Sequence, residues 1–165
     1  MRRREPVGGV TLWDWARSVY ARPGVEALCL ALQDRHGQCV AYLIWAAWAA
    51  RTGRAVGAAR VAEAASLARG WDVQVIAPLR GIRRALKQPV AGVEPQGQAA
   101  LRTRIKAEEL AAEQLLLEAL EALTPASAGA AALDPVVALS AASAAWGAPA
   151  PDDLLEALSS AFSIA

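Results

Sequence analysis

The chain has 165 residues, which suffice for one sizeable hydrophobic core and are few for two full domains. Hydrophobic residues make up 55% of it, charged residues 20%, and the net charge is +1. Much of the apolar excess is alanine, which favours helices and buries little area per residue. The longest uncharged apolar stretch near the centre lies between His36 and Arg51 and is shorter than the roughly 20 residues of a membrane span. The composition therefore excludes a membrane-spanning chain and favours a globular helical one.

The first part of the chain predicts a tail and two short helices. Residues 1–10 are polar and glycine-containing, and we expect a flexible tail without the apolar segment of an export signal, which favours a cytoplasmic location. Thr11 is suited to be the N-cap of a helix over residues 12–20. After Pro23, a second helix is predicted up to Gly37, because its apolar side chains recur at helical spacing: Val25, Leu28, Cys29 and Leu32.

Residues 38–52 predict the central helix of the fold. From Val40 to Ala50 this segment is apolar on every helical face, which is typical of a helix buried on all sides. The two cysteines flank the turn before it, and at about 1.5 Å rise per residue they lie about 9 Å out of register along the predicted hairpin. We therefore expect Cys29 and Cys39 to be unpaired, buried thiols.

Two helices and a long third one are predicted next. An alanine-rich helix over residues 56–69 is expected to end at Gly70. Residues 71–87 continue a helical pattern around Pro78, and we interpret them as one kinked helix rather than two. Residues 88–97 form the clearest loop, and residues 98–123 one long helix. Its predicted apolar face comprises Leu101, Ile105, Ala112, Leu116, Ala119, Leu120 and Leu123.

The composition changes to alanine, serine and proline after residue 123. Two further helices are predicted over residues 135–146 and 151–160, each with a proline in its first turn. The predicted fold is all-α: a compact bundle of five or six helices around a buried central helix in residues 11–123. Residues 124–165 are expected to form a loosely attached, alanine-rich helical appendage.

A stripe of cations is the strongest functional signal. Its members fall at i, i+3, i+4 and i+7 and so share one helix face: Arg80, Arg83, Arg84 and Lys87. Such a face can bind phosphates, including those of nucleic acid, or anionic lipid. It can also be a solvated face, or pair with Glu108, Glu109 and Glu113 of the long helix.

A group of aromatic side chains is the second candidate site. Together these residues could wall a pocket for a small apolar ligand: Trp13, Trp15, Tyr42, Trp45, Trp48 and Trp71. The competing interpretation is that these aromatic side chains, which recur at helical spacing, are packed in the hydrophobic core and bind no ligand. A ligand-binding role requires a cavity of roughly 300 Å³ or more between the helices.

Motifs that carry catalysis or bind a metal are missing. Residues Asp34, Arg35 and His36 place a carboxylate near the single histidine, but residues two apart on a helix do not face each other. One histidine without paired cysteine motifs falls short of a metal site, and no glycine-rich phosphate loop occurs. We therefore expect no catalytic residue, no cofactor and no metal, and an enzyme is the least expected class.

The order of several motifs resembles an uncharacterised, mainly proteobacterial family of small all-helical proteins. The resemblance covers roughly residues 11–123 and rests on these segments: Leu12-Trp13-Asp14-Trp15, residues 20–25, Leu28 to Gly37, the region Trp45 to Trp48, Trp71, and Pro78-Leu79-Arg80 with Arg83 to Lys87. It implies the helical fold and no assigned activity.

The sequence thus leads to one functional hypothesis and two alternatives. The leading hypothesis is a non-enzymatic interaction or adaptor protein that presents the basic face to a protein partner. The alternatives are a binder of a lipid or isoprenoid in a tryptophan-lined pocket, and a nucleic-acid-binding module. The oligomeric state is left open.

Overall fold

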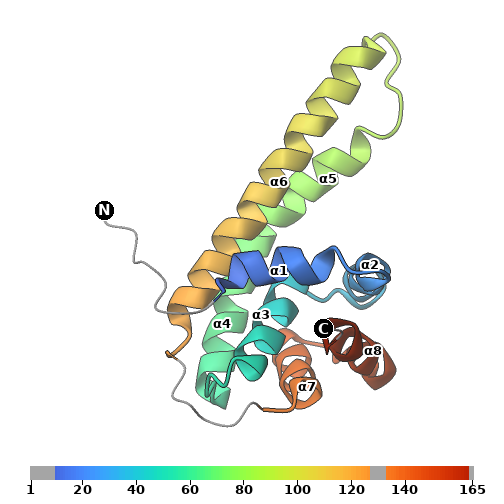
Figure 1. The fold of residues 1–165 in the computed structure, drawn as a ribbon. Helices are drawn as coiled ribbons and strands as arrows, with labels where there is room; N and C mark the ends of the chain where they lie inside the picture. Colours follow the sequence, from blue (N-terminus) through green and yellow to red (C-terminus); the bar gives the residue numbers. More distant parts are fainter. Residues whose placement is uncertain (1–9, 127–132, 164–165) are drawn as a thin grey trace.

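A computed structural model describes residues 10–126 and 133–163 of the chain. Within these ranges every regular element is a helix, which confirms the predicted all-α fold. Residues 1–9 of the expected tail lie outside the described residues. Figure 1 shows a body of packed helices from which one pair of helices projects.

Helix α3 (Val40–Arg51) is the centre of the body, as predicted. All side chains from Tyr42 to Ala50 are buried. The polar atoms of two of its aromatics have partners outside the helix. The Tyr42 hydroxyl donates to the Val61 carbonyl at 3.0 Å, and the Trp45 Nε1 donates to the Thr124 Oγ1 at 2.7 Å. Because buried polar groups are costly without partners, these bonds hold α3 in one orientation in the core.

Helices α1 (Leu12–Tyr20) and α2 (Val25–His36) lie against this body. The Thr11 Oγ1 accepts from the Asp14 N–H at 3.1 Å, which confirms the predicted N-cap. Helix α2 ends at Gly37, whose φ of 60° lies in the left-handed region that glycine tolerates best. Cys29 and Cys39 are both buried and unpaired, as predicted.

Helices α4 (Ala58–Trp71) and α5 (Ala77–Ala85) form one continuous run through a wider π-helical turn, η1 (Asp72–Ile76). The expected end of a helix at Gly70 is therefore wrong, whereas the helix does continue through Pro78 as interpreted. The wider turn explains why. Proline lacks the N–H that would bond four residues back, and its ring crowds the preceding turn, which an i to i+5 turn relieves.

Helix α6 (Pro95–Leu123) begins three residues before the predicted start. The Glu94 carboxylate caps it by accepting from the backbone N–H groups of Gln96 and Gly97. Helices α5 and α6 run side by side beyond the body and form an arm, joined by a loop at its far end (Figure 1). Leu101, predicted for the buried face, is exposed because it lies on this arm, whereas Ala112, Leu116 and Leu120 are buried.

Helices α7 (Pro135–Trp146) and α8 (Asp152–Ser163) share the core of the body. Helix α7 packs most extensively against α3 and α4, and its Leu139 is fully buried. Trp146 donates to the Gly37 carbonyl at 2.7 Å, and Arg22 donates to the Phe162 carbonyl at 2.7 Å. The expected loose attachment is therefore wrong, because α7 packs closely against α3, which its small alanine side chains allow, and α8 packs against α7 and α2. The division of the chain at residue 124 remains a prediction.

Candidate functional site

A groove of about 910 Å³ runs between two parts of the fold. One wall comes from α1 and α2, and the other from η1, α5 and α6. Gln38 and Cys39, which precede α3, and Val40, Ala41 and Ile44 at the start of α3 also line the groove. An ion pair spans the two walls, because the Arg84 guanidinium donates to the Asp34 carboxylate at 2.6 Å. Ligand sites commonly form where separate elements meet in this way.

The predicted cation stripe lines this groove, but most of its charge is already paired. Arg80 donates to the Glu109 carboxylate at 3.2 Å, and Arg83 also donates to Glu109. Arg84 pairs with Asp34, while Lys87 is exposed and has no ion pair within the described residues. The predicted pairing with the long helix thus occurs between both Arg80 and Arg83 and Glu109. Arg80 also lies 3.7 Å from the carboxylate of Glu113. Glu108 takes part in no ion pair of the described chain.

The inner part of the groove holds an uneven cluster of charges. Three carboxylates, of Asp72, Glu109 and Glu113, surround the guanidiniums of Arg80 and Arg83. The Glu109 side chain is only 8% exposed and takes hydrogen bonds from both arginines. Asp72 and Glu113 reach Arg80 only at 3.9 and 3.7 Å. Burial, and next the charge of Glu109, raises the pKa of Glu113 to about 7.

Other ionisable groups around the cluster are also perturbed by burial. Burial raises the pKa of Asp72 above its ordinary value, while Arg80 opposes the rise. It raises the pKa of the Tyr20 hydroxyl and of the Cys29 and Cys39 thiols to about 12. These thiols therefore stay protonated at neutral pH and are poor nucleophiles. The cluster can hold charge and donate hydrogen bonds, but it offers no activated nucleophile.

The outer part of the groove combines exposed apolar side chains with cations. Tyr20, Leu30 and Leu110 line it and are exposed. The rim carries three exposed cations without an ion pair in the described chain: Arg17, Lys87 and Lys106. Large apolar side chains in contact with water are unfavourable, so Tyr20, Leu30 and Leu110, which we call the apolar strip, are suited to being covered by another molecule.

The six predicted pocket aromatics are distributed over four places. Tyr42, Trp45 and Trp48 are buried in the core, where the rings of Tyr42 and Trp45 stack at 5.5 Å between centroids. Trp15 packs edge-on against Phe162, and Trp13 lines the groove. The structure does not bring these aromatics around one cavity, because they lie on three different helices and, in α1, on different sides of the same helix.

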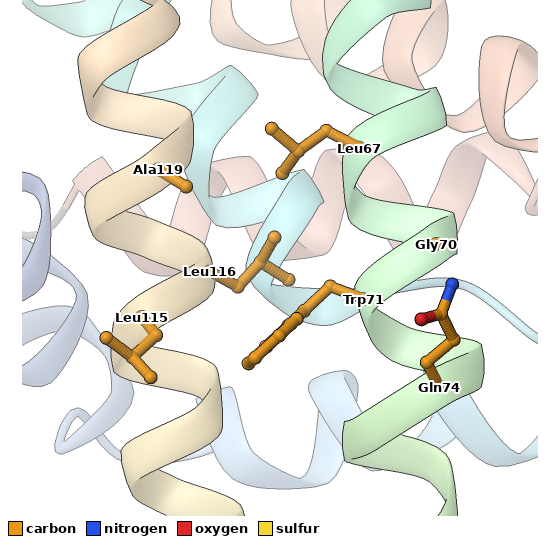
Figure 2. A pocket seen from close by; sticks show the side chains of 7 residues that line it. All are labelled: Leu67, Gly70, Trp71, Gln74, Leu115, Leu116 and Ala119. Atoms are coloured by element: carbon orange, nitrogen blue, oxygen red, sulfur yellow. The ribbon is translucent and has the colours of Figure 1, made fainter.

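Trp71 lines a separate hollow of about 430 Å³ between the α4–η1 run and α6. Figure 2 shows its ring between the two helices, near Leu67 of α4 and Leu116 of α6. The Trp71 Nε1 donates to the Ala112 carbonyl at 2.9 Å, which fixes the ring against α6. Gln74 supplies the polar side chain at its edge. This hollow is open and largely apolar.

Sequence reasoning missed most residues of the groove. Tyr20, Leu30 and Asp72 lie on three different elements and Gln38 on the segment before α3, and their convergence depends on long-range packing. A usable signal existed for Leu110, because this leucine lies off the apolar face predicted for the long helix. Large apolar residues outside the buried face of a helix mark candidate contact surfaces.

Fold and site together define a small all-α protein with a single core and a charged groove beside a projecting arm. Residues 11–120, most of the chain, match the family "Protein of unknown function (DUF2390)". The chain belongs to this family. Neither the search of curated proteins nor the search of solved structures gave a match. In the described ranges, no helix is both long and apolar enough to cross a bilayer, and no three potential ligand side chains gather as for a metal ion.

Proposed function

We propose that this protein is a non-enzymatic interaction protein that docks an amphipathic helix of a partner protein in the groove. The observation that carries the proposal is the exposed strip of Tyr20, Leu30 and Leu110. An apolar helix face laid along this strip would remove it from water, which is the usual driving force of helix-in-groove recognition.

The charges at the rim indicate the chemistry of the partner. Arg17, Lys87 and Lys106 line the same groove as the apolar strip and are exposed. Acidic residues along the edges of the docked helix would meet these cations. Such complementarity speeds association and excludes wrong partners more than it adds affinity. The partner we propose is therefore a helix with an apolar face and acidic edges.

Site-specific photo-cross-linking in the native host tests this role. A photoreactive residue is placed at Leu30 or Leu110, and as a control at Val137, which is 65% exposed on α7 outside the groove. We expect one protein to be cross-linked from both groove positions and not from Val137, through a segment with acidic edges. Equal labelling from Val137, or labelled segments without an amphipathic acidic pattern, would overturn the proposal.

A matched pair of triple variants tests the rim. Replacing Arg17, Lys87 and Lys106 by glutamine should reduce the cross-link severalfold, most clearly at low salt. The control replaces three cations that do not line the groove, namely Arg35 and Arg104, which are exposed, and the partly exposed Arg60. Equal loss in both variants would point to net charge alone. Salt-sensitive binding of a DNA or RNA oligonucleotide by the wild type would favour the nucleic-acid alternative instead.

The hollow beside Trp71 supports a second candidate function, the binding of a small apolar ligand such as a lipid or isoprenoid. Its volume of about 430 Å³ falls within the range of small-molecule sites. Farnesol is a suitable probe, and binding should change the NMR signal of the Trp71 indole N–H. Loss of the effect on replacing Leu115 by glutamine would support this site, and an unchanged indole signal in the wild type would exclude farnesol there.

A further inference from the structure

Positive charge is concentrated at the end of the α5–α6 arm. We call residues 82–107 the outer arm, which comprises the end of α5, the joining loop and the start of α6. This segment holds six of the 17 lysines and arginines of the chain but only one of its 16 aspartates and glutamates. Acidic residues therefore outnumber basic ones in the rest of the chain. The part that projects furthest from the body is strongly basic (Figure 1).

The single acid of the outer arm, Glu94, does not neutralise these cations. Both of its carboxylate oxygens accept backbone N–H groups in the first turn of α6, at 2.9 and 2.6 Å, so its charge is directed at the positive end of that helix. Lys87, Arg104 and Lys106 are exposed, and Arg102 is partly exposed. None of these four forms an ion pair with a described residue.

The tip of the arm is an ordered turn that presents apolar side chains. The Val93 N–H donates to the Val90 carbonyl at 3.1 Å and closes a β-turn, in which Gly92 has a φ of 82°. The buried Gln98 of α6 fixes this turn, because its amide donates to two carbonyls just before it and accepts from the Val90 N–H at 3.2 Å. Val90 and Val93 are nevertheless 51% and 48% exposed. Hydrogen bonds therefore hold both valines in contact with water.

Cations surround the arm behind this tip. We call Lys87, Arg102, Arg104 and Lys106 the cationic collar. Because each residue of an α-helix advances by about 100°, Arg104 and Lys106 point to nearly opposite sides of α6. Lys87 and Lys106 line the groove, whereas Arg104 does not. At about 1.5 Å per residue, Arg102 and Arg104 lie about 10 and 14 Å along α6 from its start at Pro95.

An apolar tip followed by a collar of cations matches the layers of a lipid surface. A nucleic acid would meet the cations but leave the valines in water, whereas a bilayer offers anionic phosphates outside an apolar interior. We propose that the arm inserts Val90 and Val93 into the surface of an anionic lipid membrane, while the cationic collar contacts the lipid phosphates. This inference does not rest on the helix-docking role, because Val90, Val93 and Arg104 do not line the groove.

The dimensions and charges of the chain agree with this orientation. The polar layer on each side of a bilayer is about 5–8 Å thick. With the valines at its inner edge, Lys87 and Arg102 come near the phosphates, and Arg104 stays within about 10 Å of them, roughly a Debye length. The acidic excess of the remaining chain is repelled by the same surface, which directs the arm toward it. Two valines bury little area, so the contact is reversible and requires anionic lipid.

Sedimentation with lipid vesicles tests the contact. The full-length protein is mixed with vesicles of phosphatidylcholine that contain about 30% phosphatidylglycerol, or with vesicles of phosphatidylcholine alone. We expect at least about tenfold stronger partition onto the anionic vesicles, because several cations are attracted to the negative surface. The partition should fall as the salt concentration rises. Equal partition onto both kinds of vesicle, or none onto either, would overturn the proposal.

A fluorescent label reports whether the tip enters the membrane surface. Val90→Cys is labelled with a nitrobenzoxadiazole dye, whose emission shifts to the blue in apolar surroundings. Burial raises the pKa of the native Cys29 and Cys39 thiols to about 12, so the introduced thiol reacts selectively. The control is Val137→Cys, at a position that is 65% exposed on α7. We expect a blue shift with anionic vesicles from position 90 alone. Equal shifts at both positions, or none, would contradict insertion of the tip.

Variants of the tip turn test its apolar part. Replacing both Val90 and Val93 by aspartate should weaken partition onto anionic vesicles at least about tenfold, whereas Val137→Asp should change it less than about twofold. All three side chains are exposed, so the fold should be retained, as circular dichroism can check. Partition that the folded double variant retains in full would show that the valines take no part.

A matched pair of double variants tests the collar. Replacing Lys87 and Arg104 by glutamine should weaken the partition about tenfold. The control makes the same change at Arg17 and Arg35, which are also exposed and form no ion pair in the described chain, but lie on α1 and α2. Losses of equal size would mean that net charge, and not the arm, directs the binding, and the proposal would be dropped.

A DNA duplex distinguishes the lipid surface from a nucleic acid. The duplex supplies phosphates without an apolar interior, so we expect it to bind at least about tenfold more weakly than anionic vesicles at equal phosphate concentration. Binding as tight as that of the vesicles, and unaffected by the two aspartates at the tip, would assign the collar to nucleic acid and overturn the membrane proposal.

Discussion

The α7–α8 pair and the α5–α6 arm contact the rest of the protein through different kinds of interaction. The α7–α8 pair adds the buried Leu139, Leu155 and Leu158 to the core, and hydrogen bonds from Arg22 and Trp146 fix its ends. The arm instead meets α1 and α2 across charged side chains and leaves a groove between them. This contrast indicates which surface is suited to binding a partner. The surface of α3 and α4 that α7 covers is buried and cannot contact a partner. The surface between the arm and helices α1 and α2 is joined by ion pairs and leaves apolar and charged side chains exposed.

Removing the C-terminal helices should have the largest effect. A chain ending after residue 126 exposes the apolar surface of α3 and α4 that α7 covers. We expect this chain to lose cooperative unfolding, as measured by near-ultraviolet circular dichroism during a urea titration. A truncated chain that retains a sharp transition would show that residues 124–165 are separable after all.

Breaking the centre of the arm should have the next largest effect. Glu109→Ala leaves the guanidiniums of Arg80 and Arg83 without their shared acceptor in a partly buried place. Loss of one partner of such a pair costs about 3–5 kcal/mol in the free energy of unfolding. Urea denaturation measures it, with Glu108→Ala on the exposed neighbour as control. A loss below about 1 kcal/mol would mean that solvent replaces the carboxylate.

A cavity in the α7 contact should cost slightly less. Leu139 is fully buried, and Leu139→Ala should lower the free energy of unfolding by about 2–4 kcal/mol through lost transfer energy and the cavity left behind. The exposed Val137 on the same helix gives the control variant Val137→Ala, which should change it by less than about 0.5 kcal/mol. Similar values for both variants would contradict the tight packing of α7.

The charged groove should make stability depend on pH. The folded pKa of Glu113 is about 7, above its ordinary value of 4.5, so folding favours its protonated form. The stabilisation is therefore full below about pH 4.5 and is lost as the pH rises through 7. Because the side chain is 35% exposed, we expect a change on the order of 1 kcal/mol between pH 5 and 8. Glu113→Gln should flatten this part of the profile, and an unaltered slope would refute the shift.

The ion pair across the groove should matter least. Arg84 and Asp34 are both largely exposed, and pairs of this kind contribute about 0–1 kcal/mol. Arg84→Gln should therefore leave the free energy of unfolding within about 1 kcal/mol of the wild type, as chemical denaturation can measure. A larger loss would mean that this pair holds the two walls of the groove together.

Local sequence signals predicted the helices well, because their physical causes are local. Each signal depends only on residues within a few turns of the chain: the periodicity of residues 25–32, the cap at Thr11 and the apolar faces of residues 40–50. The end expected at Gly70 failed because packing against α6, including the bond from Trp71 to Ala112, outweighs the helix cost of glycine. The alanine-rich composition of the last 40 or so residues was wrongly taken to indicate loose attachment. Alanine is common in weakly packed segments, but it also allows helices to pack closely.

The candidate site was predictable only in part. The stripe at Arg80 and Arg83 was visible from spacing alone, and pairing with Glu109 and Glu113 was one of its interpretations. Which acid binds which arginine depends on the register between α5 and α6, and this register is set by side chains far apart in the chain. Gln38 carried no sequence signal, because a single buried amide has no pattern.

The π-helical turn at Asp72–Ile76 has a further consequence for the arm. A turn of this kind is equivalent to one additional residue inserted into a regular helix, and each residue advances a helix by about 100° around its axis. The turn therefore sets the rotational phase of α5 relative to α4. This phase determines the direction in which Arg80 and Arg83 point. A single-residue deletion within the turn would therefore rotate both arginines away from Glu109 without changing either residue.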